Sequence, residues 1–290
     1  DARAINFLSK QLKALGFKLG LSRLFLKKTY DAIIVESCAG LLLIPKLKKK
    51  YPHARFIYRV SDCLEMLDSD PKLMQAETNL LPQLDLISTP VPSITSRLQT
   101  KCPSAPIATH THGINTNAFN QAHHAPSPYT HPQNAIYIGM YPGIDWDFLD
   151  ATASQFPHLK LHIFGPYKKQ ISHPNIIYYG TQPFHTLLPY IVHASIGLHI
   201  IKSPKNKHQT NTKLHTFSKS LKFMQYTYAK LPIIAPQAMQ ITEPHVFSYT
   251  NDPISIKTAV ETALNYPKEQ INTDHILSWE SLVTTLLTNT

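Results

Sequence analysis

The sequence has few cysteines and no hydrophobic run long enough to span a bilayer. Cys38, Cys63 and Cys102 lie far apart without paired spacing, which argues against a disulfide framework or a zinc site and fits a reducing cytoplasm. No run approaches the about 18 apolar residues that a transmembrane helix needs, and no segment resembles a signal peptide. We therefore expect a chain that does not cross a membrane.

Several sequence motifs of common enzyme classes are also absent. The chain has only nine glycines, and no G-x-G-x-x-G, G-x-x-x-x-G-K-[ST] or G-x-S-x-G occurs, which disfavours a dehydrogenase, a P-loop NTPase and a hydrolase. The sixteen histidines, including His110, His112, His123 and His124, have no carboxylate or cysteine partner at ligand spacing, so we expect no metal site. Basic residues are not interleaved with stacking aromatic residues, so a nucleic-acid binder is a minor alternative.

The composition is that of a globular protein with an excess of positive charge. A chain of 290 residues with 43% hydrophobic content can bury a sizeable core, and its length fits two ordinary domains. Lys+Arg 28 against Asp+Glu 18 gives a net charge of +10, which favours phosphate-bearing partners, anionic membranes or nucleic acid without choosing among them.

Helical and strand-like patterns alternate along the chain. Apolar positions at 5–28 have helical spacing, and strand and helix patterns then alternate from YDAIIVES at 30–37. The pattern lapses at 110–134, which we interpret as an interdomain linker, resumes at AIYIGMY, and is interrupted by a polar, basic loop at 202–213. Alternation at this scale predicts an α/β fold with parallel sheets.

One acidic residue stands where a ligand would bind in such a sheet. Ligands of open parallel sheets bind beyond the carboxyl ends of the strands, and Asp62 directly follows the strand-like run FIYRV. A carboxylate there can accept a proton as a general base. The alternative, which the sequence alone favours, is that Asp62 caps the next helix and Glu65 completes a capping box.

Three of the nine glycines close strand-like runs in the second half of the chain. Gly139, Gly165 and Gly180 would let a phosphate or sugar approach the backbone N–H groups closely, although ordinary turns explain any one of them. Lys222 lies within an otherwise apolar helical stretch, SLKFMQYTYAK, followed by the buried strand pattern LPIIAP. Its side chain either extends along the apolar surface to solvent or has a function.

The order of these motifs resembles that of GT-B glycosyltransferases. In particular, S-x-K-x-x-Q-Y at 220–226 followed by L-P and a strand, and the closing run LSWESLVTTLL at 277–287, resemble the GumK-type inverting β-glucuronosyltransferases of xanthan assembly. The resemblance covers most of residues 55–290. The other motifs that carry it, in order, are YRVSD, DLISTPVPSITSRL, THGINTNAF, AIYIGMYPGIDWDFL, LKLHIFGP and NIIYYGTQPFHTLLPYIVHASIGL.

The resemblance implies a domain organisation. We expect an acceptor-binding Rossmann-like domain at 1–132, truncated at its start, and a donor-binding Rossmann-like domain at 133–273, with parallel sheets facing an interdomain cleft. Residues 274–290 would form a helix that crosses back to the first domain.

The resemblance also implies site residues. Asp62 matches the strand-end aspartate regarded in that family as the base, and Lys222 would neutralise the diphosphate or the uronate carboxylate of the donor. The sequence departs from the family pattern at Thr181, where relatives carry a glutamate, and near Ile201, where they carry a tyrosine; these positions bear on nucleotide and sugar specificity. The remaining donor-binding residues implied are Ser220, Gln225, Tyr226, Gly139, Met140, Gly180 and Thr181.

The activity implied is inverting, metal-independent sugar transfer without a cofactor. A UDP-sugar, with glucuronic acid as the candidate sugar, would be the donor, and a lipid-linked glycan the acceptor, in polysaccharide biosynthesis. The basic segments at 10–28 and 45–52 could rest on anionic lipid on the cytoplasmic face of the plasma membrane, or be solvated helix faces. The alternatives are a non-catalytic GT-B-like nucleotide-sugar binding module and, less favoured, a basic nucleic-acid-binding protein.

Overall fold

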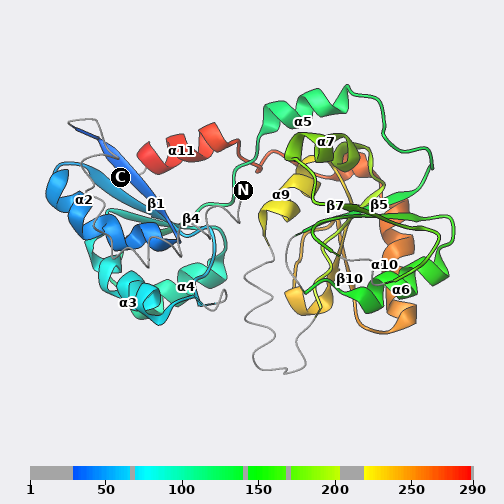
Figure 1. Ribbon diagram of the computed structural model, residues 1–290, viewed down its shortest axis with the longest axis horizontal. Helices are drawn as coiled ribbons and strands as arrows, with labels where there is room; N and C mark the ends of the chain where they lie inside the picture. Colours follow the sequence, from blue (N-terminus) through cyan, green and yellow to red (C-terminus); the bar gives the residue numbers. More distant parts are fainter. Residues whose placement is uncertain (1–28, 66–68, 140–142, 168–170, 203–218, 289–290) are drawn as a thin grey trace. The chain divides into compact units, whose positions relative to one another are not determined.

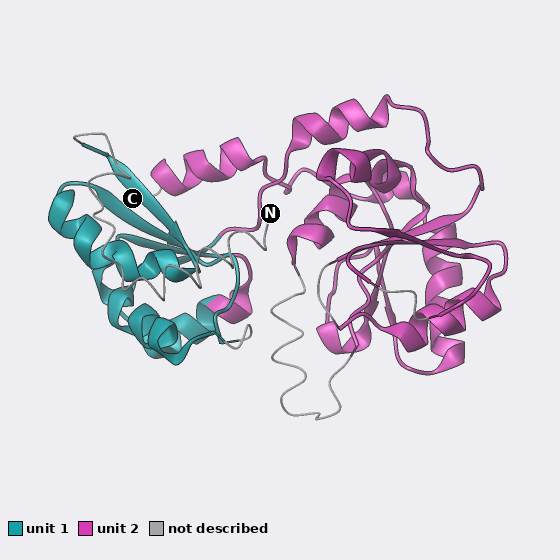
Figure 2. Ribbon diagram, in the orientation of Figure 1, with its two compact units in different colours: residues 1–89, 95–109 teal, residues 90–94, 110–290 magenta. Residues whose placement is uncertain are grey.

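The protein consists of two compact units. The computed structural model describes residues 29–65, 69–139, 143–167, 171–202 and 219–288 (Figure 1). Unit 1 comprises Asp1–Thr89 and Thr95–Thr109, and unit 2 comprises Pro90–Ile94 and His110–Thr290 (Figure 2). The helix expected at 5–28 and most of the loop expected at 202–213 lie outside the described residues.

Unit 1 is built around a four-stranded parallel sheet in the order β1-β2-β3-β4. Strand β2 is buried along most of its length, as the continuous apolar pattern predicts for a strand covered on both faces. Proline lies in the first turn, where no intrahelical N–H bond is lost, of the described helices α2, α3 and α4, the last of which begins in the short segment Pro90–Ile94 of unit 2. The elements are β1 (Ala32–Glu36), β2 (Arg55–Arg59), β3 (Leu86–Thr89), β4 (Ile107–Thr109), α2 (Ile44–Lys50), α3 (Pro71–Leu80) and α4 (Pro92–Lys101), with 3-10 turns at Ala39–Leu43 and Leu81–Gln83.

Unit 2 contains a six-stranded parallel sheet in the order β10-β9-β8-β5-β6-β7. The chain moves outward through β6 and β7, returns to pair β8 with β5, and then moves outward in the other direction. The predicted α/β fold with parallel sheets is confirmed in both units. The strands are β5 (Asn134–Ile138), β6 (Lys160–Phe164), β7 (Ile176–Gly180), β8 (Ile196–Leu198), β9 (Ile233–Pro236) and β10 (Val246–Tyr249).

Helices cover both faces of this second sheet. Ala135 and Tyr137 of β5 pack in a core cluster with residues of α6 and α10, whereas Ile136 packs in a second cluster with residues of α5, α7 and α9. Successive side chains of a strand point to opposite faces, so the two clusters lie on opposite sides of the sheet. The helices in the described part of the unit are α5 (Thr116–His123), α6 (Trp146–Gln155), α7 (Phe184–His193), α9 (Leu221–Tyr228), α10 (Pro253–Asn265) and α11 (Trp279–Thr288), with 3-10 turns at Gln237–Met239 and Lys268–Gln270.

Two elements differ from the sequence-based expectation. The segment interpreted as a linker contains helix α5, which Asn115 caps by accepting a hydrogen bond from the backbone N–H of Ala118, and whose Phe119 is fully buried in unit 2. The structure therefore groups residues 110–132 with unit 2, where the sequence suggested a linker. Strand β10 was not anticipated, because HVFSY is short and follows a polar segment. The domain roles and the crossing of the last helix stay predictions.

Helix length bears on the membrane question. None of the helices in the described ranges combines the length and apolar character required to cross a bilayer.

Candidate functional site

The three glycines singled out in the sequence lie side by side at the carboxyl ends of β5, β6 and β7. The N–H of Gly139 donates to Phe164 O at 3.1 Å, and the N–H of Gly165 donates to Gly180 O at 2.9 Å. A Cβ on Gly165 would lie 2.1 Å from Gly139 O, and the φ of +148° at Gly165 favours glycine. The side chains of Tyr137 and Tyr167 lie against Gly139 and Gly165, and only Gly180 has open space where a side chain would be.

Substitution of Gly165 should be much more costly than substitution of Gly180. In Gly165→Ala the added methyl group meets backbone that cannot move aside, so we expect the free energy of unfolding to fall by about 2–4 kcal/mol. Gly180 has a φ of +69° but nothing within 4 Å of an added Cβ, so Gly180→Ala should cost only about 1–2 kcal/mol. Urea unfolding of both variants would measure the difference, and equal losses would contradict the crowding at Gly165.

Lys222 lies in the first turn of α9, near the start of the predicted apolar helix. Its Nζ lies 4.3 Å from the ring centroid of Tyr137, a residue of the opposite core cluster, so the amine passes the carboxyl end of β5 to reach this ring. The side chain is half-buried, and burial lowers the pKa of Lys222 to about 7. Within the described ranges, no carboxylate forms an ion pair with this amine.

This placement of Lys222 is unfavourable for the folded state. A positive charge is destabilising at a helix N-terminus, where the backbone N–H groups already create positive potential. Burial without a carboxylate partner adds to that cost. An amine that contacts an aromatic ring, and pairs with no carboxylate within the described ranges, is typical of a site that meets an anionic ligand, and a perturbed pKa is a common feature of functional residues.

The strand order places this amine at a position where α/β sheets usually bind ligands. The order reverses between β5 and β8, which pair through Ala135 with Ile196 and Ile136 with Gly197. Ligands of doubly wound sheets bind outside the carboxyl ends of the strands at such a reversal. Gly139 follows β5, and Lys222 packs over Tyr137 of the same strand. The amine of Lys222, the N-terminus of α9 and the carboxyl end of β5 therefore lie together at one edge of unit 2.

The other predicted donor-binding residues have diverse environments. The Ser220 hydroxyl caps α9 by accepting a hydrogen bond from the N–H of Phe223 at 3.4 Å. Gln225 is half-buried and lies three residues from Lys222, on the same side of the helix. Thr181 is exposed directly after Gly180, and Met140 lies outside the described residues.

Tyr226 is buried and serves to attach α9 to the sheet. Its hydroxyl donates to Ile136 O and accepts from the N–H of Ile138, each at 3.1 Å, and its ring covers Gly197 so closely that a Cβ there would lie 2.6 Å from the ring. These two bonds to the backbone of β5 attach α9, and with it Lys222, to the sheet. The predicted contact of Tyr226 with the sugar donor stays a prediction.

Asp62 lies in unit 1, in the turn after β2, and it is not a helix cap. The next described helix, α3, begins at Pro71 and is capped by Asp70, whose carboxylate accepts from the N–H of Lys72. The capping interpretation favoured from the sequence is therefore wrong. Instead the N–H of Asp62 donates to Ser37 Oγ at 3.0 Å, and the exposed side chain is still surrounded by enough protein that desolvation raises its pKa.

The sequence analysis did not identify two groups of residues that lie near Lys222 and Asp62. Tyr137, whose hydroxyl lies 3.1 Å from that of Tyr167, resembles an ordinary core residue of an apolar strand, so nothing marked it as the support of Lys222. Arg97 and Lys101 contact Glu65 across more than thirty residues of sequence. In the sequence, the one signal for this contact is that Arg97 and Lys101 are four residues apart. Two residues at that spacing lie on the same side of a helix and can share a partner.

The part of the chain that the structure describes lacks a cluster suited to a metal ion. No three His, Cys, Asp or Glu side chains converge within those ranges in a way that could hold one. Metal independence stays a prediction.

Comparison with known proteins relates this geometry to one fold. Residues 17–90 match the family model "Glucuronosyltransferase GumK, N-terminal domain". The chain is 26% identical over 243 residues to the UDP-glucuronate:glycolipid 2-beta-glucuronosyltransferase of Xanthomonas campestris pv. campestris, covering 82% of this chain and 57% of that protein. The chain therefore spans little more than half the length of this relative.

Solved structures share the arrangement. The sucrose-phosphate synthase of Thermosynechococcus elongatus superposes with a TM-score of 0.61 at 13% identity, over 95% of this chain and 74% of that chain. WaaG, a glycosyltransferase involved in lipopolysaccharide biosynthesis, gives a TM-score of 0.51 at 11% identity, over 86% of this chain and 77% of that chain. The chain has the GT-B fold. The predicted resemblance of this GT-B protein to GumK is confirmed by the family model and the sequence relative.

Proposed function

We propose that this GT-B protein is an inverting, metal-independent glycosyltransferase that moves a sugar from a UDP-sugar to a hydroxyl of a lipid-linked glycan. Glucuronic acid is the candidate sugar, by analogy with the donor named for the Xanthomonas relative. The observation that carries the proposal is the buried amine of Lys222, which has no carboxylate partner in the described ranges and lies at the strand-order reversal of unit 2.

The donor half of the proposal rests on complementary charge. A nucleoside diphosphate would bring negative charge to Lys222, to the N-terminus of α9 and to the open backbone at Gly180. As the glycosidic bond to the leaving group breaks, charge grows on the departing diphosphate oxygen. A preorganised cation and N–H groups stabilise that charge, and such electrostatic stabilisation usually contributes more to catalysis than any other single effect.

The acceptor half of the proposal rests on Asp62. In an inverting transfer, the acceptor hydroxyl attacks the anomeric carbon from the side opposite the leaving diphosphate, and a base takes the hydroxyl proton. Asp62 follows a strand in the manner typical of ligand-contacting residues, and its raised pKa makes its carboxylate a better proton acceptor than an ordinary aspartate. The proton of the acceptor would pass to Asp62, and the nucleoside diphosphate would leave as the anion.

A peripheral position on the cytoplasmic face of a membrane would suit a lipid-linked acceptor. The Xanthomonas relative is named for a glycolipid acceptor. Helix α2 of unit 1 presents the exposed lysines Lys46, Lys49 and Lys50, which would attract anionic headgroups.

Calorimetry combined with a transfer assay tests the proposal. UDP should bind the chain, and UDP-glucuronate with a short lipid-linked glycan should release UDP and give a lengthened glycan. Binding of UDP without transfer across a panel of acceptors would instead support a non-catalytic nucleotide-sugar module. Tight binding of mixed-sequence DNA with steep salt dependence, and no UDP binding, would support the nucleic-acid alternative.

A further inference from the structure

The turn that carries Asp62 is held to the rest of unit 1 at several points. The N–H of Ser61 donates to Arg59 O at 3.0 Å, and the N–H of Asp62 donates to Ser37 Oγ at 3.0 Å. Leu64 is buried, with 2% of its surface exposed. These contacts fix the backbone at the beginning of the turn, so the direction of the Asp62 side chain depends on how firmly the rest of the turn is held.

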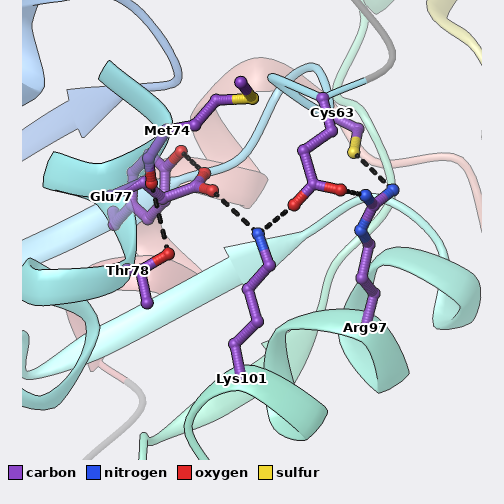
Figure 3. Close-up of polar contacts among 8 residues, drawn as sticks. Cys63, Met74, Glu77, Thr78, Arg97 and Lys101 are labelled. Atoms are coloured by element: carbon purple, nitrogen blue, oxygen red, sulfur yellow. Dashed lines mark hydrogen bonds and ion pairs between the residues drawn. The ribbon is translucent and has the colours of Figure 1, made fainter. Parts of the chain in front are cut away.

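Glu65, the last described residue before position 69, is held by two cations of α4. Glu65 forms ion pairs with both Arg97 and Lys101, which lie four residues apart and therefore on one side of the helix (Figure 3). Arg97 also approaches Cys63, with 3.4 Å between Nη1 and Sγ. Arg97 thus contacts both Cys63 and Glu65, which follow Asp62 in the turn.

A buried carboxylate extends this arrangement into the core. Lys101 Nζ lies 3.8 Å from Oε2 of Glu77, a residue of α3 that is 3% exposed. The hydroxyl of Tyr58 in β2 donates to Oε1 of Glu77 at 2.5 Å. Two cations and two carboxylates therefore link the turn to β2, α3 and α4 with balanced charge.

Global stability is a poor explanation for the ion pairs of Glu65. The Arg97 and Glu65 side chains are 26% and 28% exposed, and the Lys101 side chain is 23% exposed. Ion pairs that reach solvent contribute only about 0–1 kcal/mol to folding. By contrast, misplacement of a catalytic group by about 1 Å can cost on the order of 100-fold in rate.

We propose that Glu65 and Arg97, supported by Lys101, are positioning residues that hold the turn so that the Asp62 carboxylate meets its substrate. This inference rests on the proposed role of Asp62 as the base. The contacts on both sides of Asp62 restrain the described residues 61–65, and Arg97 suits this role because its planar guanidinium can contact two partners at once.

The test compares Glu65→Gln with Glu261→Gln, which removes an exposed ion pair with Lys257 on α10 of unit 2. In Glu65→Gln we expect kcat to fall about 10–100-fold while the Kd for UDP stays within twofold. The thermal midpoint should fall by less than about 4 °C, and Glu261→Gln should change neither kcat nor Kd. When Glu65→Gln is added to Asp62→Asn, the further loss of kcat should be small, because Glu65 acts through Asp62.

A measurement without catalysis keeps the inference testable if no transfer is found. Backbone amides of residues 61–65 should exchange with deuterium about tenfold faster in Glu65→Gln and in Arg97→Gln, with peptides of unit 2 unchanged. Unchanged exchange would overturn the positioning role whether or not the chain transfers sugar. A loss of kcat that is equally large in the Asp62→Asn background would overturn the link to Asp62, whereas a wild-type chain without transfer would overturn the proposed function instead.

Discussion

Replacement of Lys222 with methionine is expected to abolish most sugar transfer while making the folded protein more stable. Loss of one charged contact to a leaving group costs about 100–1,000-fold in kcat, or about 3–4 kcal/mol. UDP should also bind about 10–100-fold more weakly, since a charge-assisted hydrogen bond to the diphosphate is lost. Stability should nevertheless rise, because methionine has nearly the same length as lysine and carries no charge that must be buried.

The gain in stability should depend on pH in a defined way. The pKa of Lys222 is about 7 in the folded state, below its ordinary value of 10.5, so the unfolded chain binds more protons between these two values. The cost of burying Lys222 is therefore absent above about pH 10.5, grows as the pH falls, and is complete below about pH 7. Lys222→Met should exceed the wild type in stability by the largest amount at and below neutral pH.

Urea unfolding at pH 6, 8 and 10, together with calorimetry of UDP binding, checks this prediction. Lys257→Met is a suitable control, because Lys257 is exposed and paired with Glu261; it should alter neither stability nor UDP affinity by more than a small amount. Lys222→Arg keeps the positive charge and should retain part of the UDP affinity. A Lys222→Met variant that is less stable at pH 6 and still transfers sugar would show that Lys222 merely packs along the apolar surface.

Binding itself should be coupled to proton uptake. Only the protonated amine attracts the diphosphate, so UDP affinity should weaken as the pH rises above about 7. Calorimetry in buffers with different ionisation enthalpies should therefore detect protons taken up on binding at pH 8. Lys222→Met should lose this uptake.

Hydrophobic spacing was sufficient to predict the parallel α/β architecture, because buried strands and amphipathic helices have clear periods. It missed α5, since polar residues such as Asn117 and Gln121 occupy the exposed side of a helix of only eight residues, and the burial of Phe119 depends on contact with α7. Strand β10 was missed for a similar reason: four residues carry too little periodicity, and its pairing with β9 is non-local.

The sequence indicated which residues belong to the candidate sites, but not which side chains they contact. Strand-end glycines and an isolated lysine in an apolar stretch indicated the edge of unit 2. The sequence could not show that the amine of Lys222 rests on Tyr137, because that contact joins residues 85 positions apart through tertiary packing. Likewise Asp62 and Glu65 matched a capping box in spacing, yet Glu65 pairs with Arg97 and Lys101, whose positions depend on how α4 packs.

Asp62→Asn is expected to lower kcat about 100–10,000-fold without weakening UDP binding. Asparagine has the shape of aspartate and leaves the backbone N–H bond to Ser37 Oγ in place, but its amide is not a useful proton acceptor. Since the proposed donor site belongs to unit 2 and Asp62 to unit 1, the Kd for UDP should stay within about twofold. Lys222→Met and Asp62→Asn would thus separate donor binding from proton removal.

The pH–rate profile gives a second test of Asp62. Desolvation raises its pKa, and only the ionised carboxylate accepts a proton, so kcat in the wild type should increase as the pH rises through a pKa above the usual value for aspartate. The residual activity of Asp62→Asn should lack this acidic limb. If the limb persists in the variant and kcat falls less than threefold, another group takes the proton, and the exposed position of Asp62 would then serve acceptor binding at most.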